Sequence, residues 1–463
     1  MHAIVMLVIC VTTMSDFVAT RLHGPAFLKL IPECFSVVVV LVVLAQGLRK
    51  GFGGVAPKYW LTFAAMAFVF MCGILSNSVG PGPMLAGGRF YVRAIPMFLL
   101  PAVYPFTDRQ IRQQLGLLVG IGLLQLPIAA FQRWIVWSQG RFSGDNVQGT
   151  LMDSGTLSLV LISMALVLLG FFMHGKLGKA RFLTLVLLLL LPTTINETKV
   201  TIIVLPVVLL VTIVMAAPPG RRLPIAGWTA ALIVVFVAIF VPVYDLMEAS
   251  SPYKHKTLMD FFTDSKQMEN YMEAKKGTAT IGTTRQVRRG DAYRVPLEYI
   301  ARDPVHLAFG LGLGNASPSN LGSNFVGNYY GLFRSFVITS FSMFVLEIGL
   351  LGVALVFLLY WMVFADSVAL SRCRDDFLAP LAAGWVGVVV LMAICTFYSP
   401  THLFAPLSYL YWYFSGLVAA RRWQFVQQQA TEPTRAPLAG RASHRLSTPY
   451  HPAPRSAASS RES

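Results

Sequence analysis

Charged residues are scarce in this chain of 463 residues. Asp, Glu, Lys and Arg together make up 13% of it, whereas soluble domains carry about 25%. Hydrophobic residues make up 55%, and the mean hydropathy is +0.63. A soluble fold of this length would need far more polar surface. The composition therefore excludes a soluble globular protein, and apolar runs of about 20 residues indicate helices that cross a membrane.

Cysteine is scarce as well. The five cysteines form no CxxC pair and no Cys/His spacing of the kind that binds zinc. This pattern excludes a disulfide framework and predicts no metal site. The N-terminal run lacks a basic segment and an A-x-A cleavage site. We therefore expect a retained first helix and not a signal peptide.

Twelve apolar runs predict an all-α polytopic membrane protein with about 12 transmembrane helices. The runs lie at 3–19, 32–48, 59–77, 91–106, 115–137, 155–173, 181–195, 198–215, 224–244, 336–364, 377–397 and 402–420. We expect nine membrane helices in 1–244, one large periplasmic loop in 245–335 and three more helices in 336–420. The tail 421–463 is rich in Arg, Pro, Ser and Ala and is predicted to be disordered and cytoplasmic.

Lysine and arginine accumulate in alternate connections between the runs, and this bias sets the orientation of a membrane protein. One set of connections carries twelve: Arg49, Lys50, Lys58, Arg109, Arg112, Lys176, Lys179, Arg181, Arg221, Arg222, Arg372 and Arg374. The other set carries seven: Arg21, Lys29, Arg89, Arg93, Arg133, Arg141 and Lys199. The bias predicts a multi-pass protein of the bacterial inner membrane with both termini in the cytoplasm. The formal net charge of +16 is then topogenic, and no nucleic-acid partner is predicted.

Several cations from different segments are predicted to share one level at the outer membrane surface. They are Arg141, Lys199, Arg289, Arg294 and Arg334. Arginine offers bidentate donors to a phosphate and lysine offers a point charge, so such a group suits a diphosphate on a lipid. The simpler alternative is a solvated hairpin at 196–199 in which Lys199 reaches the interface. Arg133 would snorkel to the interface in the same way.

Glu347 lies within the tenth apolar run, where a carboxylate must pair with a cation or be protonated. The glycine-rich run 309–314 (FGLGLG) spells neither GxGxxG nor a P-loop, so no nucleotide or other cofactor is predicted. Taken alone, this run is expected to be a flexible loop that returns to the membrane.

The order of motifs resembles the O-antigen ligase and O-antigen polymerase family of membrane proteins. Arg289 is followed four residues later by Tyr293, then by a short helix, a proline and the glycine-rich run 309–314. The segment 347–352 (EIGLLG) is similar to the family's E-x-GLLG helix. Lys199 follows a threonine at the position where many members have arginine, and 141–153 is similar to the family's segment before the sixth span.

This resemblance implies glycan transfer on the outer leaflet from a polyprenyl diphosphate-linked oligosaccharide, without a metal. By position, Lys199 and Arg289 would hold the diphosphate, with Arg141 as a third contact. Arg294 and Arg334 are added for their charge and proximity in sequence. Glu347 is a candidate for the general base, and pairing with Arg334 or helix packing are its alternatives. A chain-length regulator is a candidate partner.

The chain departs from the ligase pattern at one position. Ligases carry a His-Asn pair about nine residues before the glutamate, where this chain has Ile338 and Thr339. The departure favours a polysaccharide repeat-unit polymerase over an O-antigen ligase. Alternatives from other functional classes are a secondary transporter, a lipid-linked sugar flippase and a scaffold of an export complex. No repeated half of the transporter kind is visible in the sequence.

Overall fold

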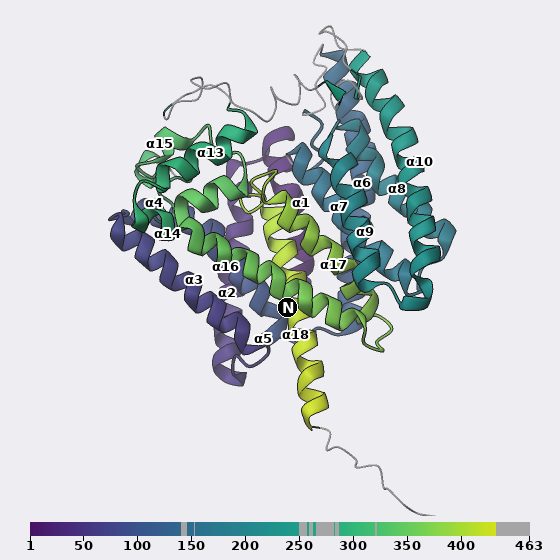
Figure 1. Cartoon of the computed structure of the whole chain (residues 1–463), viewed down its shortest axis with the longest axis horizontal. Coiled ribbons are helices and arrows are strands. Elements are labelled where there is room, and N and C mark those ends of the chain that lie inside the picture. The colour runs from purple at the N-terminus through teal and green to yellow at the C-terminus, as the bar shows by residue number, and fades with distance from the viewer. Residues whose placement is uncertain are drawn as a thin grey trace, which may run out of the picture. The chain divides into compact units, whose positions relative to one another are not determined.

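The computed structural model describes residues 1–139, 146–151, 153–249, 257–258, 263–264, 282, 287–319 and 322–431. These residues form helices joined by short turns and contain no strand, which confirms an all-α polytopic membrane protein (Figure 1). The α-helices before residue 250 are α1 (His2–Arg21), α2 (Ile31–Lys50), α3 (Pro57–Ser76), α4 (Pro81–Val92), α5 (Ala94–Val103), α6 (Asp108–Ser138), α7 (Ser154–Met173), α8 (Lys179–Ile195), α9 (Val200–Ala216) and α10 (Arg222–Ala249). Those after it are α13 (Arg289–Ile300), α14 (Pro304–Phe309), α15 (Tyr330–Phe333), α16 (Ser340–Ser371), α17 (Leu378–Cys395) and α18 (Ala405–Thr431).

Each predicted apolar run coincides with helical segments, and eight described helices are long and apolar enough to cross a membrane. The fourth run, 91–106, differs from the prediction. It is divided between the end of α4 and the ten-residue α5, and the break falls at Arg93. A span needs about 20 residues, so neither helix crosses the bilayer alone. Helix α18 also continues to Thr431, past the predicted end at 420, and residues beyond 431 lie outside the described part.

Helices α7 and α17 are the most buried of the long helices, because both are apolar on all sides. They pack closely through glycines. A Cβ at Gly170 would lie 2.1 Å from the carbonyl oxygen of Pro380 and 3.0 Å from the Cα of Gly384. The pairing of residue 170 with 380–384 makes the two helices antiparallel. Ser154 at the start of α7 therefore lies at the same end of the bundle as Cys395 at the end of α17.

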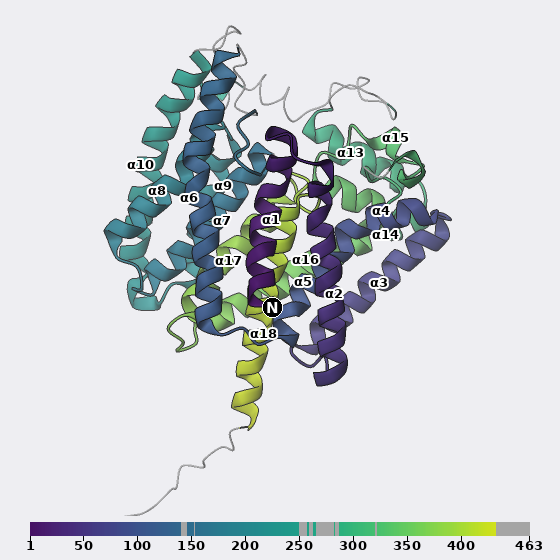
Figure 2. The same cartoon turned by 180° about the vertical axis from the view of Figure 1, so that it is seen from behind.

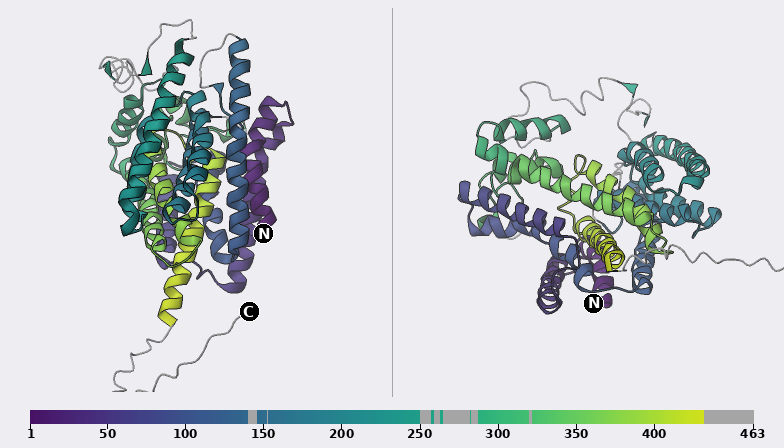
Figure 3. Two further views of the ribbon diagram at one scale, coloured as in Figure 1. Left: turned by 90° about the vertical axis from the view of Figure 1, so that its right-hand side faces the viewer. Right: turned by 60° about the horizontal axis from the view of Figure 1, so that its bottom comes forward.

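Helix α16 runs along α3 on one side and packs against α17 on the other (Figures 1 and 3). Helices α8, α9 and α10 lie together at the opposite edge of the bundle from α3. From behind, α1 lies beside α6 (Figure 2). Helix α16 is interrupted at Gly349, where φ is 62° and ψ is −173°, so residues 340–348 form a separate arm.

Ion pairs at one end of the bundle join the connections that carry most of the lysine and arginine. Lys58 Nζ lies 2.7 Å from Asp366 Oδ1, and Lys176 Nζ lies 2.8 Å from Asp376 Oδ1. Arg112 stacks on the ring of Phe377 at 4.4 Å. We call this the basic end, formed by the turns 51–56, 104–107, 174–178 and 372–377. The turns 22–30, 77–80, 196–199 and 396–404 form the other end, called the loop end. The alternation of the two predicted sets along the chain agrees with this separation.

The predicted large loop, 245–335, is partly helical. Helix α10 continues to Ala249, and α13, α14 and α15 lie in 287–335. Figure 1 shows the end of α10 and helix α13 at the loop end of the bundle.

Candidate functional site

The turn between α8 and α9 is a buried polar segment at the loop end. Asn196 donates through Nδ2 to the carbonyl of Ser154 at 2.9 Å and to the hydroxyl of Ser158 at 3.1 Å. Its Oδ1 accepts from the hydroxyl of Thr198 at 2.7 Å. These bonds fasten the turn to α7, and Asn196 is only 1% exposed. The turn is therefore not the solvated hairpin that the simpler interpretation predicts.

A buried ion pair holds the next residue of the turn. Arg133 Nη2 of α6 lies 2.6 Å from Glu197 Oε1, with the two side chains 3% and 12% exposed. The prediction that Arg133 snorkels to the interface is thus wrong. Glu197 has φ of 58°, in the left-handed region that non-glycine residues seldom adopt. Such strain persists only where the surroundings fix the residue, and here the ion pair and the bonds of Asn196 fix it.

Lys199 occupies the N-cap position of α9 and is half-buried. Its Nζ lies 5.6 Å from the ring centroid of Tyr244 on α10. A lysine at a helix N-terminus faces the positive end of the helix dipole, which disfavours a cation there. The dipole of α9 therefore does not stabilise Lys199, whereas the ring of Tyr244 attracts its ammonium group.

Arg289 begins α13 and contacts the loop between α17 and α18. It donates through Nη1 to the carbonyl oxygen of Tyr398 and stacks on the ring of Tyr398 at 4.1 Å. Tyr293, one helical turn later, donates its hydroxyl to the carbonyl oxygen of Phe397. The i, i+4 spacing places both side chains on one face of the helix. Arg289 and Tyr293 of the predicted motif therefore dock α13 on residues 397–398.

Lys199 and Arg289 are brought to the same end of the bundle by the antiparallel pair α7 and α17. Asn196 is bonded to the start of α7, and the loop that contacts Arg289 follows the end of α17. Lys199 lies beside the ring of Tyr244, and Arg289 contacts Tyr398. The other three predicted cations have different surroundings. Arg294 lies 3.4 Å from Asp291 and 3.7 Å from Glu298, Arg334 is exposed, and Arg141 lies outside the described residues.

Glu347 is 1% exposed and is hydrogen-bonded on both carboxylate oxygens. Oε2 accepts from the hydroxyl of Tyr91 at 2.9 Å. Oε1 accepts from the hydroxyl of Ser317 at 2.6 Å and from the backbone N–H of Ala316 at 3.1 Å. Among the ion pairs of the described residues none includes Glu347, so the predicted pairing with Arg334 is not present there.

The glycine-rich run 309–314 docks on the break in α16 beside Glu347. The N–H of Leu311 donates to the carbonyl of Leu346 at 2.6 Å, and Leu311 is fully buried. Gly310 and Gly349 both have positive φ, and a Cβ on Gly310 would lie 2.6 Å from the backbone nitrogen of Gly349. Only glycine fits this approach. The run is thus a packed turn and not the flexible loop predicted from the motif alone, and Glu347 holds it in place.

A second charged cluster was not predicted as a unit. Arg93 is 4% exposed, lies 3.7 Å from Glu33 and donates to the carbonyls of His402 and Leu403 at 2.7 and 2.8 Å. Arg89, one turn earlier, lies 4.0 Å from the same carboxylate. Two arginines at i, i+4 in an apolar run were the available signal. Burial and the charge of Arg93 lower the pKa of His402 to about 3, so this histidine is neutral at neutral pH.

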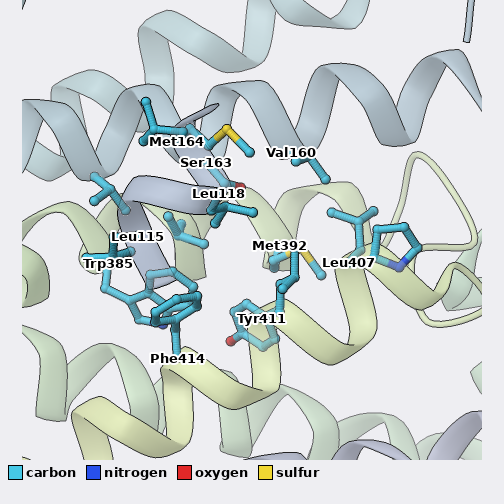
Figure 4. Close-up of a pocket in the computed structure, with 15 residues that line it drawn as sticks. Leu115, Leu118, Val160, Ser163, Met164, Trp385, Met392, Leu407, Tyr411 and Phe414 are labelled. Atoms are coloured by element: carbon cyan, nitrogen blue, oxygen red, sulfur yellow. The ribbon is translucent and has the colours of Figure 1, made fainter. Parts of the chain in front are cut away.

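Figure 4 shows one of the cavities of the bundle, between α6, α7, α17 and α18. Its volume is about 40 Å³, and apart from Ser163 and the hydroxyl of Tyr411 its walls are apolar. None of the residues that line it is charged. Across the described part of the chain, no three His, Cys, Asp or Glu side chains are arranged to hold a metal ion.

Comparisons with protein families and with curated proteins found no match to this chain. The fold defines a multi-pass membrane protein of helices. The resemblance to O-antigen ligases and polymerases stays a prediction from its motifs.

Proposed function

We propose that this protein is a polysaccharide repeat-unit polymerase of the bacterial inner membrane, with both termini in the cytoplasm. It would transfer glycan from a polyprenyl diphosphate-linked donor to a sugar hydroxyl of the acceptor on the outer leaflet, in exopolysaccharide or O-antigen biosynthesis. The observation that carries the proposal is the position of Lys199 and Arg289. The turn that carries Lys199 is bonded to α7, and Arg289 is bonded to the loop after α17. Both therefore lie at the loop end of the antiparallel pair α7 and α17.

The proposed reaction breaks the bond between the anomeric carbon of the donor and an oxygen of the diphosphate. The acceptor hydroxyl forms the new glycosidic bond and releases its proton, and polyprenyl diphosphate leaves. Negative charge grows on the diphosphate as this bond breaks, so cations fixed beside it stabilise the transition state more than the ground state. Lys199 and Arg289 are assigned this role.

The general base is not assigned to Glu347 in this proposal. Both of its carboxylate oxygens are occupied by Tyr91, Ala316 and Ser317. Glu347 instead acts as a positioning residue, because the turn that it holds follows α13 and α14, and α13 carries Arg289.

The test uses a bacterial strain that lacks its own copy of the gene and carries plasmid-borne variants. Lys199→Ala and Arg289→Ala are expected to abolish long polymer while single repeat units still reach the outer leaflet. Arg289→Lys should rescue only partly, because an ammonium group cannot replace a bidentate guanidinium. The matched control is Arg302→Ala, which removes an exposed arginine that also stacks on a tyrosine, Tyr299 at 5.7 Å.

Polymer length is measured on gels, and the amount of protein in the membrane is measured in parallel. Normal polymer from both alanine variants would refute the role of the cations. Repeat units that stay on the inner leaflet would indicate a flippase, and polymer of normal length that is not attached to its final acceptor would indicate a ligase.

A further inference from the structure

A groove of about 520 Å³ lies between α1 and α6. Figure 2 shows these two helices side by side. Its walls include Phe17 of α1 and a stripe of apolar side chains on α6, namely Leu124, Ile128, Phe131 and Ile135. The stripe from 124 to 135 covers about 16 Å of helix axis at about 1.5 Å per residue. Pro127 also lines the groove and removes one backbone hydrogen bond from α6 at its middle.

The groove faces outward and not into the protein core. Phe131 is 58% exposed and Leu124 is 44% exposed, although both are large and apolar. Such side chains in a helix that spans a bilayer contact hydrocarbon. Because lipid tails are as apolar as these walls, helices in a membrane associate through shape and not through the hydrophobic effect. A groove left open between two helices is therefore filled by a hydrocarbon chain.

The polar end of the groove lies at the loop end of the bundle. Arg21, the last residue of α1, is exposed, and its Nη2 reaches the carbonyl of Asn146 across the groove at 3.5 Å. None of the carboxylates in the described part of the chain forms an ion pair with Arg21. Gln139, near the end of α6, is exposed at the same end of the groove.

The rim of this polar end is fixed by hydrogen bonds. Gln132 donates to the carbonyl of Gly149 at 2.7 Å and accepts from the backbone N–H groups of Gln148 and Gly149 at 3.0 and 2.8 Å. These bonds hold the segment that begins with Asn146 against α6. The groove thus combines an apolar channel with one guanidinium at its polar end.

We infer that the groove between α1 and α6 binds a polyprenyl diphosphate, with its chain along the α6 stripe and its diphosphate at Arg21. The charge of Arg21 is complementary to a diphosphate, which carries more negative charge than the single phosphate of phosphatidylglycerol. The identity of this lipid rests on the proposed function. In a reaction between two lipid-linked glycans, the groove would seat one carrier while Lys199 and Arg289 hold the diphosphate of the other.

The experiment uses purified full-length protein in nanodiscs and a polyprenyl diphosphate with a diazirine on its chain. After irradiation, mass spectrometry should place the label on peptides of α1 and α6. Ile128→Trp fills the channel and should remove this label. Arg21→Gln should weaken labelling about fivefold, the effect of losing one arginine at a lipid surface. Val234→Trp, on an exposed apolar face of α10 (65% exposed), and Arg302→Gln are the matched controls and should not change it.

Unlabelled polyprenyl diphosphate should displace the probe, and phosphatidylglycerol should not. Equal displacement by both lipids would overturn the proposed occupant, and unchanged labelling of Arg21→Gln and Ile128→Trp would overturn the site. Arg21→Gln changes an exposed side chain, so it keeps the test valid if Ile128→Trp fails to fold.

The double variant Lys199→Ala/Arg289→Ala separates this inference from the proposed function. It should lose polymer in cells and still label the groove. If it makes normal polymer while the groove is labelled, the proposed function fails and the lipid site stands. If polymer is lost and the wild-type groove is never labelled, the lipid site fails alone.

Discussion

Two regions at the loop end carry the proposed cations, and they are held in different ways. The turn 193–199 is fixed by side chains that bond to other side chains, through the ion pair of Arg133 with Glu197 and the amide of Asn196. The docked segment 287–317 is fixed through backbone atoms, by carbonyls 397 and 398 and by the close approach of Gly310 to Gly349. The first region therefore depends on a buried ion pair. The second depends on hydrogen bonds to backbone carbonyls and on the close approach of two glycines.

The ion pair of Arg133 with Glu197 should give the largest effect on stability, because removing one partner leaves the other charge buried. Glu197→Ala is expected to lower the free energy of unfolding by roughly 3–5 kcal/mol, whereas Arg133→Met/Glu197→Met should restore most of it. Thermal unfolding in detergent measures both. Arg133→Glu/Glu197→Arg should recover part of the stability, and a swap no better than either single change would mean that the turn is not held by matched charges.

Lys199 and Arg289 should differ in their contribution to stability, although both are proposed to stabilise the diphosphate. Both Lys199→Ala and Arg289→Ala are expected to slow transfer about 100- to 1000-fold, equivalent to about 2.7–4 kcal/mol. Only Arg289→Ala should also lower the melting temperature, because Arg289 docks α13 on Tyr398. Limited proteolysis within 287–300 should be faster in Arg289→Ala than in Lys199→Ala. Equal proteolysis would contradict a separate docking role.

Local patterns predicted the helices well and their partners poorly. Each apolar run forms helix because its hydropathy depends only on the residues of the run itself. Arg93 ends α4 within a predicted run, and the sequence offered no way to see that its partners are the carbonyls of His402 and Leu403. Glu347 was singled out correctly as a buried carboxylate. Its donor Tyr91 is 256 residues away, so only the tertiary fold could reveal that Glu347 holds a loop.

Acidification tests the loop between α17 and α18 through His402, because this loop also carries the carbonyls of Phe397 and Tyr398 on which α13 docks. Its pKa is about 3 in the folded protein and about 6.5 when unfolded, so below pH 6.5 the unfolded chain binds more protons. Stability should therefore fall as the pH is lowered, by about 2 kcal/mol between pH 7.5 and pH 5. The melting temperature of His402→Gln should depend less on pH over this range. The same slope in wild type and variant would exclude His402 as the cause.

The smallest effect on stability is expected at Oε1 of Glu347, which accepts hydrogen bonds from two donors. It tests whether the backbone donor alone can satisfy this oxygen. Ser317→Ala removes the bond to Oε1 but leaves the N–H of Ala316 on the same oxygen. The carboxylate is then not left unsatisfied, so the loss should be about 0.5–1.5 kcal/mol. Tyr91→Phe, which removes the hydroxyl that donates to Oε2, should cost more, about 1–3 kcal/mol. If Ser317→Ala lowers the melting temperature more than Tyr91→Phe does, the N–H of Ala316 does not compensate for the lost hydroxyl.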